Sequence, residues 1–311
     1  MEISECIEIL SRQNDILIVS HVRPDGDTLG SSGALCSALR RMGKRAYMYK
    51  NPEITEKYLP YVAGFFPPAG FTEKYTVTVD TAEPSLFPKG FSGKPDMCID
   101  HHPSNSRYTK NLLLGAKKSA CGEIILELIK AMLGGIDKTE ATLLYIAIST
   151  DTGCFQYSNT NSATFRAAAE TLDGGANVHE LNQRLFRKQS KARIMLEGMI
   201  FSGMSFHRNG GVAVATVTKE MMAKAGATEN DCDDLASLSG RVEGAVVSVT
   251  IRENDDGGSK ISVRSDPSVN SSDICAVYGG GGHAMAAGCT IDCPPEEAKG
   301  KILAAIDLIW K

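Results

Sequence analysis

Short runs of apolar residues alternate with helix-like patterns along the first half of the chain. The apolar runs lie at residues 15–20, 45–50, 75–80 and 95–100. Apolar residues recur at helical spacing in segments 2–13, 33–43, 120–133 and 139–149. A continuous apolar run flanked by helices is typical of a strand that is buried on both faces of a parallel sheet. The pattern therefore predicts a doubly wound, mainly parallel α/β sheet.

A second, smaller α/β domain is expected in the last third of the chain. A helical pattern over 162–183 is followed by a basic stretch at 184–193, which we interpret as a helical linker. Further strand-like runs and helical patterns lie at 211–217, 245–251, 260–265, 271–278 and 295–310. The sequence thus predicts three parts, namely residues 1–183, a linker helix at 184–206 and a second domain at 207–311.

Composition excludes several classes of protein. The chain has 311 residues, 42% of them hydrophobic, and a formal net charge of -4. Such a chain is not disordered, and without a basic excess it is not a nonspecific binder of long nucleic acids, although a local pocket can still bind small anions. Its nine cysteines form no C-x-x-C pair, which favours free thiols in a reducing compartment. No leader or bilayer-spanning run is visible, so we expect a cytoplasmic protein with no membrane partner.

Aspartates and histidines gather at four points of the first domain. These are the segments HVRPDGD, the aspartate after YTVTV, IDHH and STDTG. They contain five carboxylates and three imidazoles, on His21, Asp25, Asp27, Asp80, Asp100, His101, His102 and Asp151. We expect all eight at strand ends or loops along one edge of the sheet, where ligands bind in such folds.

This group of side chains indicates a metal centre. So many carboxylates would repel one another unless a cation lies among them. A mixture of imidazole and carboxylate suits Mn, Fe, Co or Zn better than Ca or Mg, and two ions sharing one carboxylate form the usual clamp for phosphoester hydrolysis. Each segment alone has a plainer explanation, because strand-end aspartates often cap helices and Pro-Asp-Gly is common in turns. The combination of all four is what favours a metal site.

A glycine run in the second domain is a candidate anion site. Gly280, Gly281 and Gly282 let backbone N–H groups approach an anion closely, and His283 adds a donor. Arg264 ends a strand-like run and carries a forked donor suited to phosphate. The alternative is that the run is only a flexible turn before small residues.

The basic stretch also has two interpretations. Arg184, Arg187, Lys188 and Lys191 are spaced to lie on one face of a helix. Such a face is usually only solvated. The alternative is that it attracts a short polyanion.

Taken together, these motifs resemble those of the DHH phosphoesterases. HVRPDGD, Asp80, IDHH and STDTG look like the four motifs of that family, and GGGGHAMAAG looks like the Gly-Gly-Gly-His motif of the DHH-associated C-terminal domain. Their order and the linker are similar to those of the short two-domain members, the bifunctional oligoribonuclease/pAp phosphatases. The resemblance extends over roughly residues 10–310, with motifs of both domains in the right order.

The resemblance implies a role for each motif residue. One Mn²⁺ ion would be bound by His21 and Asp25. The other would be bound by Asp27, His101 and Asp151. Asp80 would bridge the two ions, and Mg²⁺ or Co²⁺ could substitute for Mn²⁺.

The resemblance also implies catalytic and substrate-binding residues. His102 would lie beside the scissile phosphate, and Asp100 would orient the histidine pair. Residues 1–183 would form the catalytic domain. The domain at 207–311 would bind substrate through Arg264, Gly280, Gly281, Gly282 and His283.

The implied activity is manganese-dependent hydrolysis of short RNA or DNA oligonucleotides to mononucleotides, together with removal of the 3′-phosphate from 3′-phosphoadenosine 5′-phosphate (pAp). The nearest alternative is a phosphodiesterase of the same family that acts on c-di-AMP or linear pApA. An alternative of another class is a non-catalytic nucleotide-binding protein, but the complete set of metal-binding residues favours an enzyme. Oligonucleotides and small nucleotides are the expected partners, and a homodimer is compatible with the resemblance.

Overall fold

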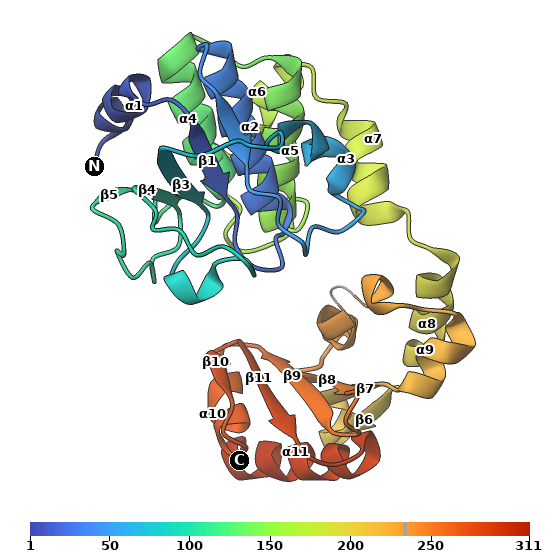
Figure 1. Cartoon of the computed structure of the whole chain (residues 1–311). Coiled ribbons are helices and arrows are strands. Elements are labelled where there is room, and N and C mark those ends of the chain that lie inside the picture. Colours follow the sequence, from blue (N-terminus) through green and yellow to red (C-terminus); the bar gives the residue numbers. More distant parts are fainter. Residues whose placement is uncertain (233–234) are drawn as a thin grey trace. The chain divides into compact units, whose positions relative to one another are not determined.

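The chain folds into two compact units, residues 1–188 and 189–311 (Figure 1). The structure is a computed structural model that describes residues 1–232 and 235–311. Each unit has its own sheet and its own hydrophobic core. The predicted α/β fold with a second, smaller sheet domain is confirmed.

The first unit is built on a parallel sheet of five strands in the order β2-β1-β3-β4-β5. The strands are β1 (Ile16–Val19), β2 (Ala46–Met48), β3 (Tyr75–Val79), β4 (Met97–Asp100) and β5 (Asn111–Leu114). All of their pairings are parallel, and every residue of β1, β3 and β4 is buried. These runs are mostly apolar because both faces of the sheet are covered, and Thr76 and Thr78 of β3 are buried with them. The short strand β5 was not predicted from the sequence.

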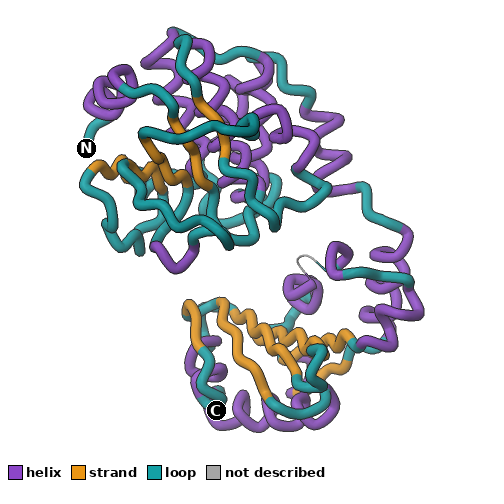
Figure 2. The backbone as a smooth tube through the Cα atoms, in the orientation of Figure 1, coloured by secondary structure: helices purple, strands orange, loops and turns teal. Residues whose placement is uncertain are grey.

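Helices pack beside this sheet (Figure 2). They are α1 (Ile3–Arg12), α2 (Gly26–Arg41), α3 (Leu59–Val62), α4 (Cys121–Leu133), α5 (Lys138–Asp151), α6 (Ser162–Asp173) and α7 (Val178–Asn182). Helix α2 begins seven residues before the predicted start at residue 33. The reason is that the Asp25 side chain accepts hydrogen bonds from the backbone N–H groups of Asp27 and Thr28 and so caps the helix.

Helices α2 and α5 approach each other closely at a glycine. A Cβ atom on Gly30 would lie 2.3 Å from the carbonyl oxygen of Leu143 and 2.9 Å from the backbone nitrogen of Ala147. A Cβ on Gly33, one turn later, would contact only the side chain of Leu143, at 3.1 Å. Backbone atoms cannot move aside as a side chain can, so Gly30 is required for the packing that positions both helix ends.

Replacing Gly30 by alanine is expected to lower the free energy of unfolding by about 1–3 kcal/mol through overpacking. Gly33→Ala is the matched control, since it lies in the same helix and gains the same helix propensity. We expect the control to be neutral or slightly stabilising. Urea unfolding followed by circular dichroism compares the two variants, and equal stabilities would contradict the close packing at Gly30.

The second unit contains a sheet of six strands in the order β10-β11-β9-β8-β7-β6. The strands are β6 (Ser205–His207), β7 (Val212–Val217), β8 (Val247–Glu253), β9 (Ser259–Ser265), β10 (Gly281–His283) and β11 (Ala286–Ile291). Only the β7–β8 pair is parallel among those described. The helices are α8 (Lys191–Ser202), α9 (Lys219–Ala225), α10 (Ser271–Ala276) and α11 (Pro295–Ile309). Within the described residues, none of these or the earlier helices has the length and apolar content needed to cross a membrane.

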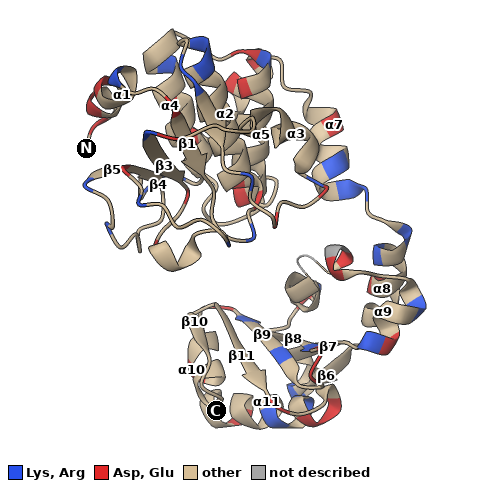
Figure 3. Ribbon diagram, in the orientation of Figure 1, with Lys and Arg blue, Asp and Glu red and all other residues tan. Residues whose placement is uncertain are grey.

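The basic stretch does not form one helix face, contrary to the prediction. A π-helical turn, η3 (Gln183–Arg187), ends at Arg187, and α8 begins only at Lys191. Ser190 starts the new helix because its side chain accepts a hydrogen bond from the backbone N–H of Arg193. Arg184 and Arg187 therefore lie on η3 and Lys191 on α8, with Lys188 in the break between these two segments. Figure 3 shows the basic residues of this part of the chain in blue.

Candidate metal centre

The predicted aspartates and histidines converge at the carboxyl edge of the first sheet. His21 and Asp80 follow β1 and β3, and Asp100 ends β4. Three sets of ligand atoms each lie within 4.8 Å of one another, namely His21–Asp25–Asp80, Asp27–His101–Asp151 and Asp80–His101–His102.

Asp151 and Asp27 lie on helices and Asp25 caps one, which corrects the expectation of strand ends and loops. Asp151 is the last residue of α5, and Asp27 lies in the first turn of α2. The two helix ends are in contact, because a Cβ on Gly26 would lie 2.4 Å from Thr150 Oγ1. This contact brings the carboxylates of the two helices to the same edge of the sheet.

Asp80 lies between two histidines. Its Oδ2 is 3.8 Å from His21 Nε2 and its Oδ1 is 3.5 Å from His101 Nε2, which are longer than hydrogen bonds. The side chain is only 3% exposed, and Oδ1 has no hydrogen-bond partner. Burial, followed by the charges of Asp27 and Asp25, raises the pKa of Asp80 well above its usual range. A buried carboxylate in this position fits a ligand shared by two cations.

Both flanking histidines are oriented by backbone carbonyls. His21 Nδ1 lies 2.7 Å from the oxygen of Val22, and His101 Nδ1 lies 3.1 Å from the oxygen of Lys118. A carbonyl only accepts hydrogen bonds, so Nδ1 is the donor, and Nε2 faces the cluster, where its lone pair can bind a cation. The Nε2 atoms lie 3.5–3.8 Å from carboxylate oxygens. Neutral imidazoles held in this way are suited to bind metal.

Asp27 is held at the base of the cluster by the start of α4. Its carboxylate accepts hydrogen bonds from the backbone N–H groups of Cys121 (2.6 Å) and Gly122 (3.0 Å) and from Ser31 Oγ (2.9 Å). The N-terminus of a helix favours negative charge. Burial and the charges of Asp151 and Asp25 nevertheless raise the pKa of Asp27 well above its usual range.

The donor set therefore fits divalent cations. Four carboxylates, on Asp25, Asp27, Asp80 and Asp151, face two imidazole Nε2 atoms. Positive charge among them would relieve the repulsion between the carboxylates. Nitrogen and carboxylate donors without a thiolate suit Mn, Fe, Co or Zn ions.

Asp100 holds the histidine pair from behind the cluster. Its Oδ1 accepts hydrogen bonds from the backbone N–H groups of His101 (2.8 Å) and His102 (3.3 Å) and pairs with His102 Nδ1 at 2.8 Å. Its Oδ2 accepts a hydrogen bond of 2.6 Å from Asn105 Nδ2. Asn105 and Ser31 were not predicted from the sequence. Ser31 lies four residues after Asp27, and this spacing places both on one helix face only because α2 begins at Gly26.

A pocket of about 410 Å³ opens over the cluster. It is lined by His21, Val22, Arg23, Asp25, Asp80, Leu86, His102 and Asp151. The His102 side chain is 43% exposed and borders this space, whereas Asp100 behind it is fully buried. The pocket therefore gives a substrate access to the proposed metal ligands and to His102.

Comparison with known proteins identifies the family. The sequence matches the DHH family, N-terminal domain, over residues 15–148 and the DHHA1 domain over residues 209–311. It is 37% identical to the bifunctional oligoribonuclease and PAP phosphatase NrnA of Thermus thermophilus, over 90% of this chain and 85% of that protein. The chain belongs to the DHH family. The protein is a metal-dependent hydrolase of phosphoester bonds.

Other DHH proteins extend the comparison. The cyclic-di-AMP phosphodiesterase PdeA of Listeria monocytogenes is 27% identical over 98% of this chain, which spans about half (49%) of PdeA. An exopolyphosphatase-related protein from Bacteroides fragilis shares the fold, with a TM-score of 0.88, 23% identity and coverage of 98% of this chain and 95% of that chain. The exonuclease RecJ bound to manganese has a TM-score of 0.52 at 13% identity, over 99% of this chain and 94% of that chain.

In the DHHA1 domain, the second half of the glycine run forms a strand. Gly281, Gly282 and His283 make up β10, which pairs antiparallel with β11. His283 lies opposite Ala286, and Ala286 lies opposite Arg264 on β9. Directly opposed residues point to the same face of a sheet. The exposed side chains of Arg264 and His283 therefore share a face, with only a small residue between them.

The hairpin depends on glycine at one position in particular. Gly282 has φ +151°, and a Cβ there would lie 2.5 Å from the carbonyl oxygen of Ala286, whereas a Cβ on Gly281 would meet nothing within 4 Å. If β10 binds substrate, Gly282→Ala is expected to raise KM about tenfold or more by displacing His283, and Gly281→Ala is expected to raise it far less. Steady-state kinetics of both variants checks this, and equal KM values would contradict it.

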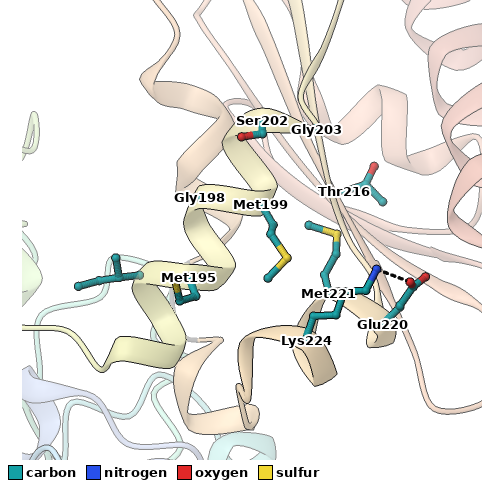
Figure 4. Close-up of a pocket in the computed structure, with 10 residues that line it drawn as sticks. Met195, Gly198, Met199, Ser202, Gly203, Thr216, Glu220, Met221 and Lys224 are labelled. Carbon is teal, nitrogen blue, oxygen red and sulfur yellow. Dashed lines mark ion pairs between the residues drawn. The ribbon is translucent and has the colours of Figure 1, made fainter.

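A larger pocket in the second unit, of about 720 Å³, has different chemistry (Figure 4). It lies among α8, β7 and α9, and Met195, Met199 and Met221 form much of its wall. Its rim carries an ion pair of 2.6 Å between Glu220 and Lys224. No His, Cys or Asp is among its lining residues. The smaller pocket over the aspartate–histidine cluster is therefore the candidate active site.

Proposed function

We propose that the protein is a manganese-dependent phosphoesterase that hydrolyses short oligonucleotides to mononucleotides and dephosphorylates pAp. The observation that carries the proposal is the buried Asp80, whose two oxygens face His21 and His101. This arrangement supports two ions, one bound by His21, Asp25 and Asp80 and one by Asp27, His101, Asp151 and Asp80. The similarity to NrnA over most of both chains supports the choice of substrates.

The cations would supply charge neutralisation at the phosphate and an activated water. The residues of the chain hold and orient the reactants around them. Asp100 accepts a hydrogen bond from His102 Nδ1 and raises the pKa of His102, and in the protonated ring Nε2 can donate a hydrogen bond to the phosphate or to the leaving oxygen. Arg23 lines the same pocket and offers a guanidinium to an anionic substrate.

We propose that the second domain binds a phosphate group of the substrate. Arg264 and His283 are exposed on one face of the sheet and flank the small Ala286. Their donors are suited to an anion above that residue. In this proposal residues 1–183 catalyse, residues 184–206 link and residues 207–311 bind substrate through Arg264, Gly280, Gly281, Gly282 and His283.

A substrate panel tests the proposed function. Purified protein with Mn²⁺ is assayed on pAp, the dinucleotide pApA, a longer RNA, c-di-AMP and polyphosphate. We expect the highest kcat/KM for pApA and pAp. Hydrolysis of polyphosphate alone would refute the proposal. Mg²⁺ and Co²⁺ in place of Mn²⁺ test the choice of metal.

The similarity to PdeA favours one second candidate, a phosphodiesterase that acts on c-di-AMP. The same panel separates the two activities. A kcat/KM for c-di-AMP above that for pApA would establish the second candidate and replace the first.

A further inference from the structure

A sharply turned loop follows the proposed metal ligand Asp151. Gly153, Cys154 and Phe155 all have left-handed backbone angles, with φ of 55°, 55° and 67°. Such a conformation is unfavourable for residues with a Cβ atom. The free-energy cost of this backbone conformation indicates that the position of the loop beside the proposed metal centre is important.

Asn159 connects this loop to the backbone next to Asp151 and His101, which belong to the same proposed cation site. Its Nδ2 donates hydrogen bonds of 3.1 Å to the carbonyl oxygens of Asp151 and Ser119. Ser119 follows Lys118, whose carbonyl orients His101. Ser119 Oγ donates a further hydrogen bond of 2.5 Å to the carbonyl of Asn159. The loop is therefore fixed to the backbone that positions both Asp151 and His101.

Tyr157 presents its ring from this anchored loop. A Cβ on Gly153 would lie 2.4 Å from the Tyr157 ring atoms Cε1 and Cζ, so the ring packs directly on the glycine backbone. The Tyr157 N–H donates a hydrogen bond of 3.0 Å to the carbonyl of Thr152. Although it is held at these points, Tyr157 is 55% exposed. The result is an ordered aromatic surface, supported by a residue only two positions from Asp151.

The pocket over the metal ligands does not itself provide such a surface. Its lining residues offer imidazoles, carboxylates and a guanidinium, but include no Tyr, Phe or Trp. These groups suit a phosphate and metal ions, whereas a nucleobase binds best by stacking on an aromatic ring. A nucleotide whose phosphate lies at the cluster therefore needs a ring nearby for its base.

We propose that Tyr157 stacks against a nucleobase of the substrate and sets its position beside the metal centre. The inference rests on the proposed function, because it assumes a nucleotide substrate. Stacking accepts every base, since each has a π face. Tyr157 thus selects nucleotides over other phosphate esters without selecting a sequence.

The test compares two substrates that differ only in their bases, the dinucleotide pApA and an analogue with abasic riboses. Tyr157→Ala is expected to raise KM for pApA about tenfold. For the abasic analogue, KM is expected to change less than about twofold in the same variant. Tyr157→Phe keeps the ring and should recover most of the lost affinity. Phe206→Ala is the matched control, because Phe206 is equally exposed (55%) but lies on β6 of the other unit.

Three results would overturn the inference. An unchanged KM for pApA in Tyr157→Ala, in an enzyme that remains active, removes the stacking role and leaves the proposed function intact. An equal rise of KM for pApA and for the abasic analogue shows a structural effect of the loop. Failure of the wild-type enzyme on every nucleotide of the panel refutes the proposed function and the stacking role together.

Discussion

Replacing Asp80 by asparagine is expected to reduce kcat by about a thousandfold or more and, at the same time, to stabilise the metal-free protein. The loss of activity follows from its position, since one carboxylate faces both His21 and His101. An amide binds divalent cations more weakly than a carboxylate does, so both proposed sites are weakened at once. Steady-state kinetics with Mn²⁺ measures this effect.

The gain in stability follows from the sign of the pKa shift. Burial and neighbouring carboxylates raise the folded-state pKa values of Asp80 and Asp27 above the ordinary 3.8. At these two positions the folded, metal-free protein binds more protons than the unfolded chain, so their contribution to stability is greatest below pH 3.8 and falls as the pH rises through the raised pKa values. The amide in the Asp80→Asn variant carries no charge and should reduce this fall.

Thermal unfolding in EDTA, over about pH 4 to 8, checks the prediction. The metal-free variant should melt above the wild type at neutral pH and should gain little from added Mn²⁺. Asp173→Asn is the matched control, because it removes an exposed carboxylate of α6 in the same unit. An Asp80→Asn variant that is less stable than wild type in EDTA at neutral pH would show that repulsion among the carboxylates does not destabilise the metal-free fold.

The sheet edge could be predicted because parallel strands leave a strong local signal. The buried runs before His21, Asp80 and His101 are mostly apolar, and polar residues follow at the carboxyl end of each. In a parallel sheet these ends meet at one edge, so three distant segments could be placed together from sequence alone.

Other parts of the site depend on contacts that have no local signal. Asp151 belongs to the same cluster only because α5 packs on α2 at Gly26 and Gly30, a contact between residues far apart in the sequence. Strand β10 could not be predicted because glycine disfavours strands, yet pairing with β11 overrides that preference. The break at residues 188–190 was missed because the basic spacing continues through it, while Ser190 starts a new helix.

Replacing Asp100 by asparagine is expected to lower kcat by about 10- to 100-fold and the free energy of unfolding by about 2 kcal/mol. In the proposed function, Asp100 is a positioning residue that acts through His102. Burial opposes its charge, but the hydrogen bonds from His102 and Asn105 outweigh burial and hold the pKa of Asp100 below its usual value. In return, the hydrogen bond to Asp100 raises the pKa of His102. The amide introduced by Asp100→Asn would place its NH₂ group against the NH₂ group of Asn105, so that one donor loses its acceptor.

A double replacement separates the lost hydrogen bond from the lost charge. The double variant combines Asp100→Asn with Asn105→Asp. Its amide at position 100 can donate a hydrogen bond to the new carboxylate at position 105. That carboxylate can also accept the hydrogen bond that the Arg107 N–H donates to Asn105 Oδ1 in the wild type (2.7 Å). We expect urea unfolding to show that stability returns close to that of wild type. Activity should remain low, because the acceptor of the His102 Nδ1 hydrogen bond is now neutral and no longer raises the pKa of His102. Full recovery of kcat in the double variant would mean that Asp100 contributes only geometry. Low stability of the double variant would mean that the hydrogen bond between residues 100 and 105 does not stabilise the fold.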